Sequence, residues 1–263
     1  MKNKLLSGFA FLFILSGFAY GQDEKRSFLY IETGIDLLGC EAPEKEYIRG
    51  DIYPNQYDDM NPAPDFVADQ VTNLLYTDFL GLKFEYRVLN NKLGVAGGLR
   101  YTRVVSSIGK SSYWSDNDEE YFYLQYAQNG TNTEYAKVRE ITQRSGYLGI
   151  PLELNLYPFS AQKVNPYFKA GATFNFNVAS RTDLVFWNEE MEPYEEEVAA
   201  VIEDPYPFYS SLYLGFGLQI RPAGKPGFNL EFCFPVGMIT TGEEGFYDPR
   251  VGVGFRLTFR IPF

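Results

Sequence analysis

Ten charged residues alternate along the chain with apolar neighbours, and the carboxylates among them are the side chains that could support acid–base chemistry. They are Glu32, Lys83, Glu85, Arg87, Arg100, Glu153, Lys169, Glu231, Arg256 and Arg260. Glu153 and Glu231 are carboxylates of the type that glycoside hydrolysis uses in pairs. The sequence contains no histidine, which excludes a Ser-His or Asp-His mechanism. We therefore expect no enzymatic activity, no cofactor and no metal site.

The alternation runs through eight segments, and a period of two is typical of β-strands with unlike faces. One face of each segment is apolar and aromatic, whereas the other carries Gly, Thr, Asn and the charges. The segments are residues 29–37, 79–88, 93–102, 147–156, 167–176, 212–221, 228–236 and 251–263. Each is close to the ~9–11 residues of a tilted membrane strand. The pattern predicts an all-β fold, an eight-stranded antiparallel transmembrane β-barrel with its apolar face toward lipid.

The ten charges then fall on the inner face of the barrel. An eight-stranded barrel is just wide enough inside to be filled by its own side chains. Because an unpaired buried ion is costly, these charges should pair with one another and close the lumen. The alternative is that they line a narrow path for ions.

The connections between the segments alternate in length. Short links fall at 90–92, 160–165 and 222–227, and the other links are long. Outer-membrane barrels have short periplasmic turns and long outer loops, so the long links are expected outside the cell. The first and third long links are rich in Asp and Glu. They are either solvated loops or a surface for a basic protein partner, or for divalent cations that bridge to lipopolysaccharide phosphates.

The second long link contains a hairpin signal. Asn129 and Gly130 separate strand-like runs at 121–126 and 133–142, and Asn-Gly between such runs favours a tight turn. The second run carries charges on both faces, so we expect a hairpin that rises above the membrane. The alternative is two further membrane strands and a ten-stranded barrel.

The N-terminal residues have a pattern that is typical of an export signal. Lys2 and Lys4 precede an apolar run over 5–19, and small residues follow it. This pattern predicts a secretory signal peptide at 1–21, with 22–263 as one barrel domain. The apolar run is too short to span a bilayer comfortably.

The C-terminus looks like the assembly signal of outer-membrane barrels. The chain ends on Phe263, with Ile261 and Phe259 in alternation before it. We expect the barrel assembly machinery to recognise this ending. The alternative is the last strand of a secreted β-sandwich.

The net charge and the cysteine content bear on the partners and on the disulfides that the protein could have. The formal net charge is −11, which argues against nucleic acid as a partner. The two cysteines, Cys40 and Cys233, are far apart and form either one disulfide or two free thiols.

Two stretches resemble the PorT-like outer-membrane β-barrel family of Bacteroidetes. Residues 147–154, YLGIPLEL, are similar to a YLxIPLxL strand of that family, and 166–171, PYFKAG, fit the strand that follows. The resemblance is clearest over 79–178 and the terminal strand. It implies a barrel in the bacterial outer membrane, surrounded by lipid and lipopolysaccharide. We expect a structural or adhesive protein or an accessory of an envelope secretion complex; the alternative is a small channel for ions or solutes.

Overall fold

The computed structural model describes residues 26–41, 48–49, 73–109, 122–129, 132–159, 164–220, 226–241 and 248–263. The signal peptide predicted at 1–21 and most of the first long link lie outside these residues. The described elements are β1 (Ser27–Glu41), β2 (Ile48–Arg49), β3 (Asn73–Val88), β4 (Leu93–Ile108), β5 (Phe122–Asn129), β6 (Asn132–Leu156), β7 (Val164–Phe186), η3 (Glu189–Tyr194), α2 (Glu195–Ala199), β8 (Phe208–Ile220), β9 (Gly227–Thr241) and β10 (Asp248–Pro262).

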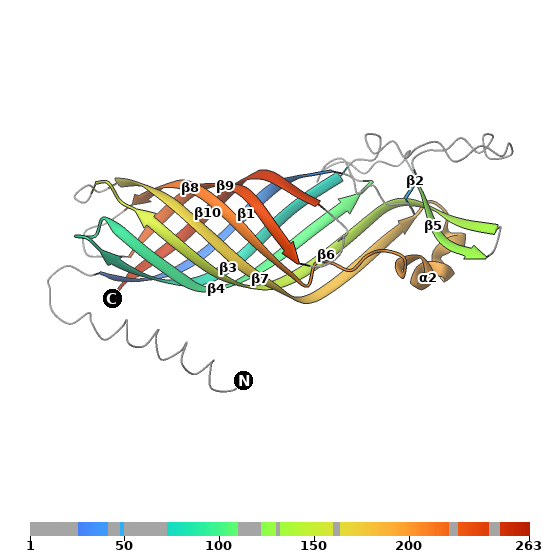
Figure 1. Ribbon diagram of the computed structural model, residues 1–263, viewed down its shortest axis with the longest axis horizontal. Helices are drawn as coiled ribbons and strands as arrows, with labels where there is room; N and C mark the ends of the chain where they lie inside the picture. Colours follow the sequence, from blue (N-terminus) through green and yellow to red (C-terminus); the bar gives the residue numbers. More distant parts are fainter. Residues whose placement is uncertain are drawn as a thin grey trace, which may run out of the picture.

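Eight of these strands form a closed antiparallel barrel (Figure 1). The order around the wall is β1, β3, β4, β6, β7, β8, β9 and β10, and β10 pairs with β1 to close the ring. β5 pairs with β6 outside the ring, and β2 pairs with β5. The eight-stranded prediction is therefore confirmed, and the ten-stranded alternative is wrong.

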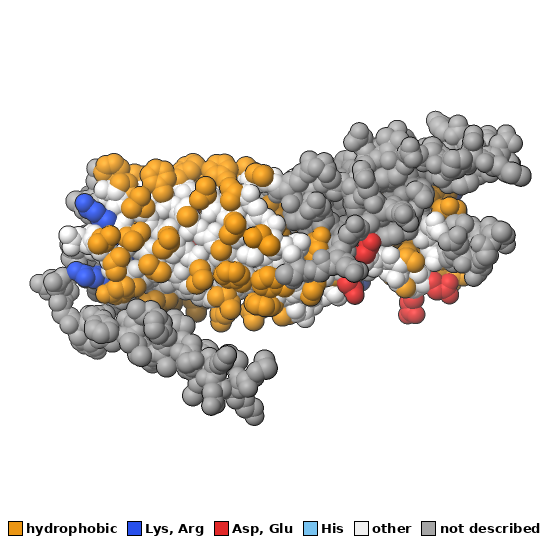
Figure 2. Space-filling view, viewed as in Figure 1, with side chains coloured by type: hydrophobic (Ala, Val, Ile, Leu, Met, Phe, Trp, Pro, Cys, Tyr) orange, Lys and Arg blue, Asp and Glu red, His pale blue; other side chains and the backbone are white. Residues whose placement is uncertain are grey.

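The unlike faces of the strands separate into an apolar outside and a polar inside. Leu82, Leu152, Phe168 and Phe232 are exposed on the outer wall, and the residues next to them in sequence are mostly buried. In Figure 2, hydrophobic side chains are spread along the barrel surface, and no charged side chain of a described residue is seen among them in the middle of the barrel. This apolar band is what a lipid-facing wall requires, because lipid offers no partner for polar groups.

β6 and β7 are much longer than predicted. They span 25 and 23 residues, against predicted segments at 147–156 and 167–176. Their ladder continues beyond the barrel until Val138 pairs with Phe186. The second arm of the predicted hairpin and the fourth barrel strand are therefore one strand. The alternation fades beyond the apolar band because outward positions there become polar, although the backbone pairing continues.

One end of the barrel, here called the turn end, carries the short link between β3 and β4. Leu89, Asn90 and Asn91 have φ of 51°, 55° and 63°, a left-handed conformation that Asn tolerates better than most residues. The short link predicted at 90–92 is confirmed, whereas those at 160–165 and 222–227 fall largely outside the described residues. The C-terminus lies at the same end (Figure 1), where Phe263 N donates to Ser27 O at 3.2 Å.

At the opposite end, here called the loop end, the chain after β7 turns back beside the β5–β6 hairpin and returns to the barrel at β8 (Figure 1). This segment, residues 187–207, contains η3 and α2 and is called the cap. None of the described helices is both long and apolar enough to cross a membrane. The cap packs on an apolar cluster with the ends of β3, β4 and β6 and with β5.

Candidate functional site: the barrel lumen and its cap

All ten predicted charged residues lie inside the barrel, and each is at most 5% exposed. They come from seven of the eight barrel strands, because each occupies an inward position of its strand. Most of them fall into two groups, a central network around Glu153 and a lower network around Glu85 near the turn end.

Glu153 is the centre of the larger group. Lys83 Nζ lies 2.8 Å from Glu153 Oε1 and 2.7 Å from Oε2, and Lys169 Nζ lies 3.0 Å from Oε2. The Tyr213 hydroxyl donates to Glu153 Oε1 at 2.7 Å. One carboxylate is thus shared between two ammonium groups and a phenol.

Glu32 and Glu231 extend this network across the lumen. Lys83 Nζ is 2.5 Å from Glu32 Oε2, and Arg100 donates two hydrogen bonds to Glu32 Oε1 at 3.0 and 2.7 Å. On the other side, Lys169 Nζ is 2.5 Å from Glu231 Oε2. Every carboxylate of the central network has cationic neighbours, which offsets the cost of removing the charges from water.

A glycine makes room for Glu32. A Cβ atom at Gly81, which pairs with Glu32 on the neighbouring strand, would lie 2.8 Å from Glu32 Oε1 and 2.9 Å from its Cγ. The absence of a side chain at Gly81 therefore allows the carboxylate to lie against the barrel wall. This accounts for one of the glycines on the inner face.

Two arginines enclose an aromatic ring beside the network. Arg100 Cζ lies 4.2 Å and Arg256 Cζ lies 5.3 Å from the Phe79 ring centroid. Arg256 Nη1 is also 3.7 Å from Glu153 Oε1, and Nη2 is 4.0 Å from Asp36 Oδ2. Asp36 was not among the predicted charges, although its place on the inner face of β1 is the signal that could have found it.

The lower network is built around one ion pair. Arg87 pairs with Glu85 and stacks on Tyr157, with its Cζ 3.7 Å from the ring centroid. Tyr157 and Asn155 each donate to Glu85 Oε2 at 2.9 Å. Arg260 lies 5.0 Å from the Phe28 ring centroid and, among the described residues, joins neither network through an ion pair.

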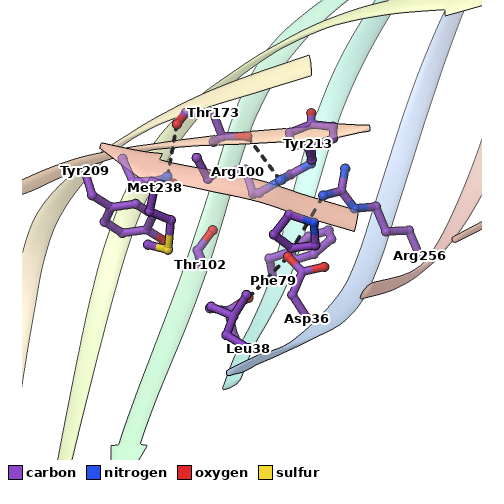
Figure 3. Close-up of a pocket in the computed structure, with 14 residues that line it drawn as sticks. Asp36, Leu38, Phe79, Arg100, Thr102, Thr173, Tyr209, Tyr213, Met238 and Arg256 are labelled. Carbon is purple, nitrogen blue, oxygen red and sulfur yellow. Dashed lines mark hydrogen bonds and ion pairs between the residues drawn. The ribbon is translucent and has the colours of Figure 1, made fainter. Parts of the chain in front are cut away.

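Two small cavities lie along the lumen. The larger, shown in Figure 3, is about 30 Å³ and lies between the central network and the loop end, where Arg100 and Arg256 reach toward Phe79 and Asp36. The smaller is about 10 Å³ and lies between the two networks, lined by Lys83 and Glu85 among others. A water molecule needs roughly 10–15 Å³ measured in this way. Each cavity has room for one or two water molecules, but not for a larger solute.

The cap packs against β6 at the loop end. Val198, Ile202 and Tyr206 are buried in the apolar cluster, together with Tyr147 from β6. The Tyr147 hydroxyl donates to Tyr206 O at 3.0 Å. The third long link was considered as a solvated loop, but its apolar side chains anchor it to the barrel.

The outer face of the cap is acidic. Its exposed carboxylates are Glu189, Glu190, Glu192, Glu195, Glu196, Glu197 and Asp204. Acidic side chains gather at this end in Figure 2. The cap also touches the hairpin, since the Tyr194 and Tyr126 ring centroids lie 6.4 Å apart. Partial burial and the hydrogen bond that Tyr126 donates to Glu134 raise the pKa of Tyr126. The cap and the β5–β6 hairpin together form what is called here the platform.

The predicted insertion signal occupies the outer wall at the turn end. Phe259 packs on Phe228 with ring centroids 5.1 Å apart, and Phe263 packs on Phe84 at 5.2 Å. Ile261 lies between them in the same row and is half-buried. The three side chains thus lie on the outer face of β10, where this strand pairs with β1 and β9.

The described cysteine and carboxylate side chains bear on the expectations for a disulfide and for a metal site. Cys233 is a free, buried thiol and does not form the disulfide with Cys40 that the sequence allowed. Among the described residues, no group of three or more Cys, Asp or Glu side chains is placed to hold a metal ion.

Comparison with known proteins identifies the family. The sequence model of the family described as outer membrane protein beta-barrel domain matches residues 79–241 of this chain. No curated protein matches. Among solved structures, OprG from Pseudomonas aeruginosa is 13% identical, covering 91% of this chain and 98% of its own, with a TM-score of 0.44.

Two further solved structures show similarly low sequence identity and TM-scores. Outer membrane protein W of E. coli is 12% identical, covering 92% of this chain and 100% of its own, with a TM-score of 0.34. Ail of Yersinia pestis is 12% identical, and the match covers 90% of this chain and 99% of Ail, with a TM-score of 0.33. These likenesses carry no argument about function, and the assignment depends on the family match and the fold. The chain belongs to the outer membrane protein beta-barrel domain family and is an integral outer-membrane protein.

Proposed function

We propose that this protein is a non-enzymatic outer-membrane barrel that holds an acidic platform outside the cell. The platform serves adhesion to a basic protein partner, or docking of such a partner in an envelope secretion complex. The observation that carries this proposal is the anchoring of the cap. Val198, Ile202 and Tyr206 fix it to the barrel while six glutamates on its other side face solvent.

A fixed acidic surface suits recognition of a basic partner. Opposite charge speeds encounter and selects partners, and a preordered surface loses little conformational freedom on binding. The ladder between β6 and β7 keeps the platform beyond the apolar band. Its acidic face therefore stands clear of the lipid headgroups.

The lumen supports a role other than catalysis. Glu153 and Glu231, the two carboxylates considered for acid–base chemistry, are both held in ion pairs with Lys169. Both carboxylates are thus engaged in ion pairs that offset the cost of burying their charges, as expected for a structural role. The absence of histidine supports the same conclusion.

The proposal includes export and orientation. Residues 1–21 would direct secretion, and the barrel assembly machinery would recognise Phe259, Ile261 and Phe263. The turn end would then face the periplasm, and the apolar band would contact lipid and lipopolysaccharide. The resemblance of residues 147–154 and 166–171 to strands of the PorT-like family of Bacteroidetes supports an origin in that branch.

Adhesion of intact cells to polylysine-coated beads tests the platform. Glu195, Glu196 and Glu197 changed together to Gln should lower bead binding several-fold, and added salt should lower wild-type binding. Lys92→Gln, an exposed change at the turn end, is the matched control and should have no effect. Equal binding by the triple variant and the wild type would remove the acidic surface from the proposal.

A small channel is the second candidate. It is favoured by the polar lining of the lumen and by the two cavities that lie one after the other along it. Conduction would require the central network to rearrange, because Lys83, Glu153 and Lys169 meet across the lumen between these cavities. Electrical recording distinguishes the two candidates.

A further inference from the structure

A group of arginines lies on the outer wall where the apolar band ends. On β4 the outward row passes from Leu99 and Tyr101 to Arg103, and on β6 it passes from Leu148 to Arg144. On β7, Arg181 faces outward beyond the band. The three arginines thus stand on three neighbouring strands at the border toward the loop end.

The pairing of the strands brings these arginines together. Arg144 and Arg181 are direct partners in the β6–β7 ladder, and Arg144 pairs on its other side with Val105, two residues along from Arg103. Like charges placed opposite each other in a sheet destabilise the pairing. Asp183 relieves this repulsion, because it pairs with Arg144 and accepts a hydrogen bond from Arg181 Nε at 2.5 Å.

Among the described residues, Arg144 and Arg181 carry an excess of positive charge. Arg103 Nη2 lies 2.6 Å from Asp78 Oδ2, so this pair is balanced. Arg144 and Arg181 share the single carboxylate of Asp183. The described residues of this group therefore comprise three guanidinium groups and two carboxylates. The side chains of Arg103, Arg144 and Arg181 are 52%, 51% and 78% exposed, which leaves their donors accessible from outside.

An apolar surface lies directly beneath these charges. Tyr101 and Leu148 pair across β4 and β6, and both are exposed on the outer wall. Gly146 leaves space for Tyr101, since a Cβ atom there would lie 3.1 Å from Tyr101 Cζ. The ring therefore lies against the wall below the arginines. An acyl chain can pack on this surface while its headgroup reaches the guanidinium groups.

We propose that Arg103, Arg144 and Arg181 form a binding site for the phosphate group of an outer-leaflet glycolipid. Guanidinium groups offer paired donors that match phosphate oxygens and bind them more strongly than neutral donors do. Basic side chains at the border of a membrane span reach the headgroup level, where lipid phosphates lie. The inference rests on the orientation in the proposed function, in which the loop end faces outward.

Binding of lipid A by the purified, refolded protein in zwitterionic micelles tests the site. The probes are diphosphoryl lipid A and its dephosphorylated form, and the readout is retention in native mass spectrometry. Arg144→Gln combined with Arg181→Gln should weaken binding of the diphosphoryl form at least tenfold. Asp183→Asn should strengthen it several-fold, because a competing carboxylate is removed. Lys92→Gln, an exposed cation at the turn end, is the matched control and should change binding less than twofold.

Three outcomes would overturn the site. They are equal binding by the double variant and the wild type, equal binding of the dephosphorylated lipid, and full displacement of the lipid by millimolar inorganic phosphate, which would indicate a site for free anions. The heat-modifiable mobility of each variant checks folding, and Arg181→Gln alone, at the most exposed position, is the second variant. Loss of this site would leave adhesion through the platform glutamates unchanged, so the two proposals fail separately.

Discussion

Lys83 Nζ lies 2.7 Å from Glu153 Oε2, although β3 and β6 are not neighbours in the barrel wall and β4 runs between them. The two residues are 70 positions apart in sequence. Their contact joins two strands that are not hydrogen-bonded to each other, through the interior of the barrel. The interior is therefore a paired polar core that supports the barrel.

Removal of Glu153 should destabilise the barrel strongly. Glu153→Leu leaves Lys83, Lys169 and Arg256 without their shared carboxylate, and breaking a buried pair in this way costs about 3–5 kcal/mol. Urea unfolding in lipid vesicles, followed by tryptophan fluorescence, measures the loss. Asp78→Asn is the control, because its partly exposed pair with Arg103 is worth about 1 kcal/mol or less. Equal midpoints for the two variants would contradict this account.

Glu231→Leu should also lower the free energy of unfolding of the barrel. Its carboxylate faces Lys169 and accepts a hydrogen bond from Tyr167 at 2.5 Å. Lys169 retains Glu153 as a partner, so the loss should lie toward the lower end of about 3–5 kcal/mol. The same unfolding assay measures it, and a cost as small as that of Asp78→Asn would show that Glu231 is not an essential partner.

The cap should loosen when its apolar anchor is shortened. Ile202→Ala removes a side chain that is 8% exposed, and such changes cost about 2 kcal/mol or more. Amide hydrogen exchange should rise across residues 187–207 and stay unchanged at β1. Glu196→Ala, on the exposed side of α2, is the control. Unchanged protection of the cap in Ile202→Ala would mean that the cluster does not hold it.

Phe263 should contribute to assembly rather than to general contact with lipid. Deletion of Phe263 should lower the folded, heat-modifiable fraction in the outer membrane, and Phe263→Ala should do so more mildly. Phe168→Ala is a matched control, because Phe168 is as exposed as Phe263, at 58%, but lies within β7. Similar losses for both positions would argue against a terminal signal.

The orientation of the barrel in the outer membrane can be determined by cysteine labelling on intact cells. In a Cys40→Ser background, Glu196→Cys should react with a membrane-impermeant thiol reagent on intact cells, and Lys92→Cys should not. Cys233 is buried and gives little background. The reverse pattern would place the turn end outside the cell and would refute the proposed orientation.

The barrel and the content of its lumen could be predicted from period-two alternation. Arg256 and Glu231, for example, stand between outward-facing neighbours and were placed inside correctly. Which carboxylate meets which cation could not be predicted, because this depends on the register and closure of all eight strands. Lys83 meets Glu153 only once the wall has curved around the lumen.

The cap could not be predicted for a different reason. Val198 follows three glutamates, so composition indicated a solvated loop. Its burial depends on a cluster whose other members come from β3 to β6 and from β8. The continuous β6 and β7 were missed because outward Arg144 and Arg181 end the apolar alternation while the backbone ladder goes on.

Electrical recording tests the central claim, closure of the barrel, most directly. Purified wild-type protein in planar lipid bilayers should show no large, steady conductance, because paired side chains fill the lumen. A stable, ion-selective current in the wild type, with its preference between cations and anions altered by Glu231→Lys, would contradict closure and establish a channel.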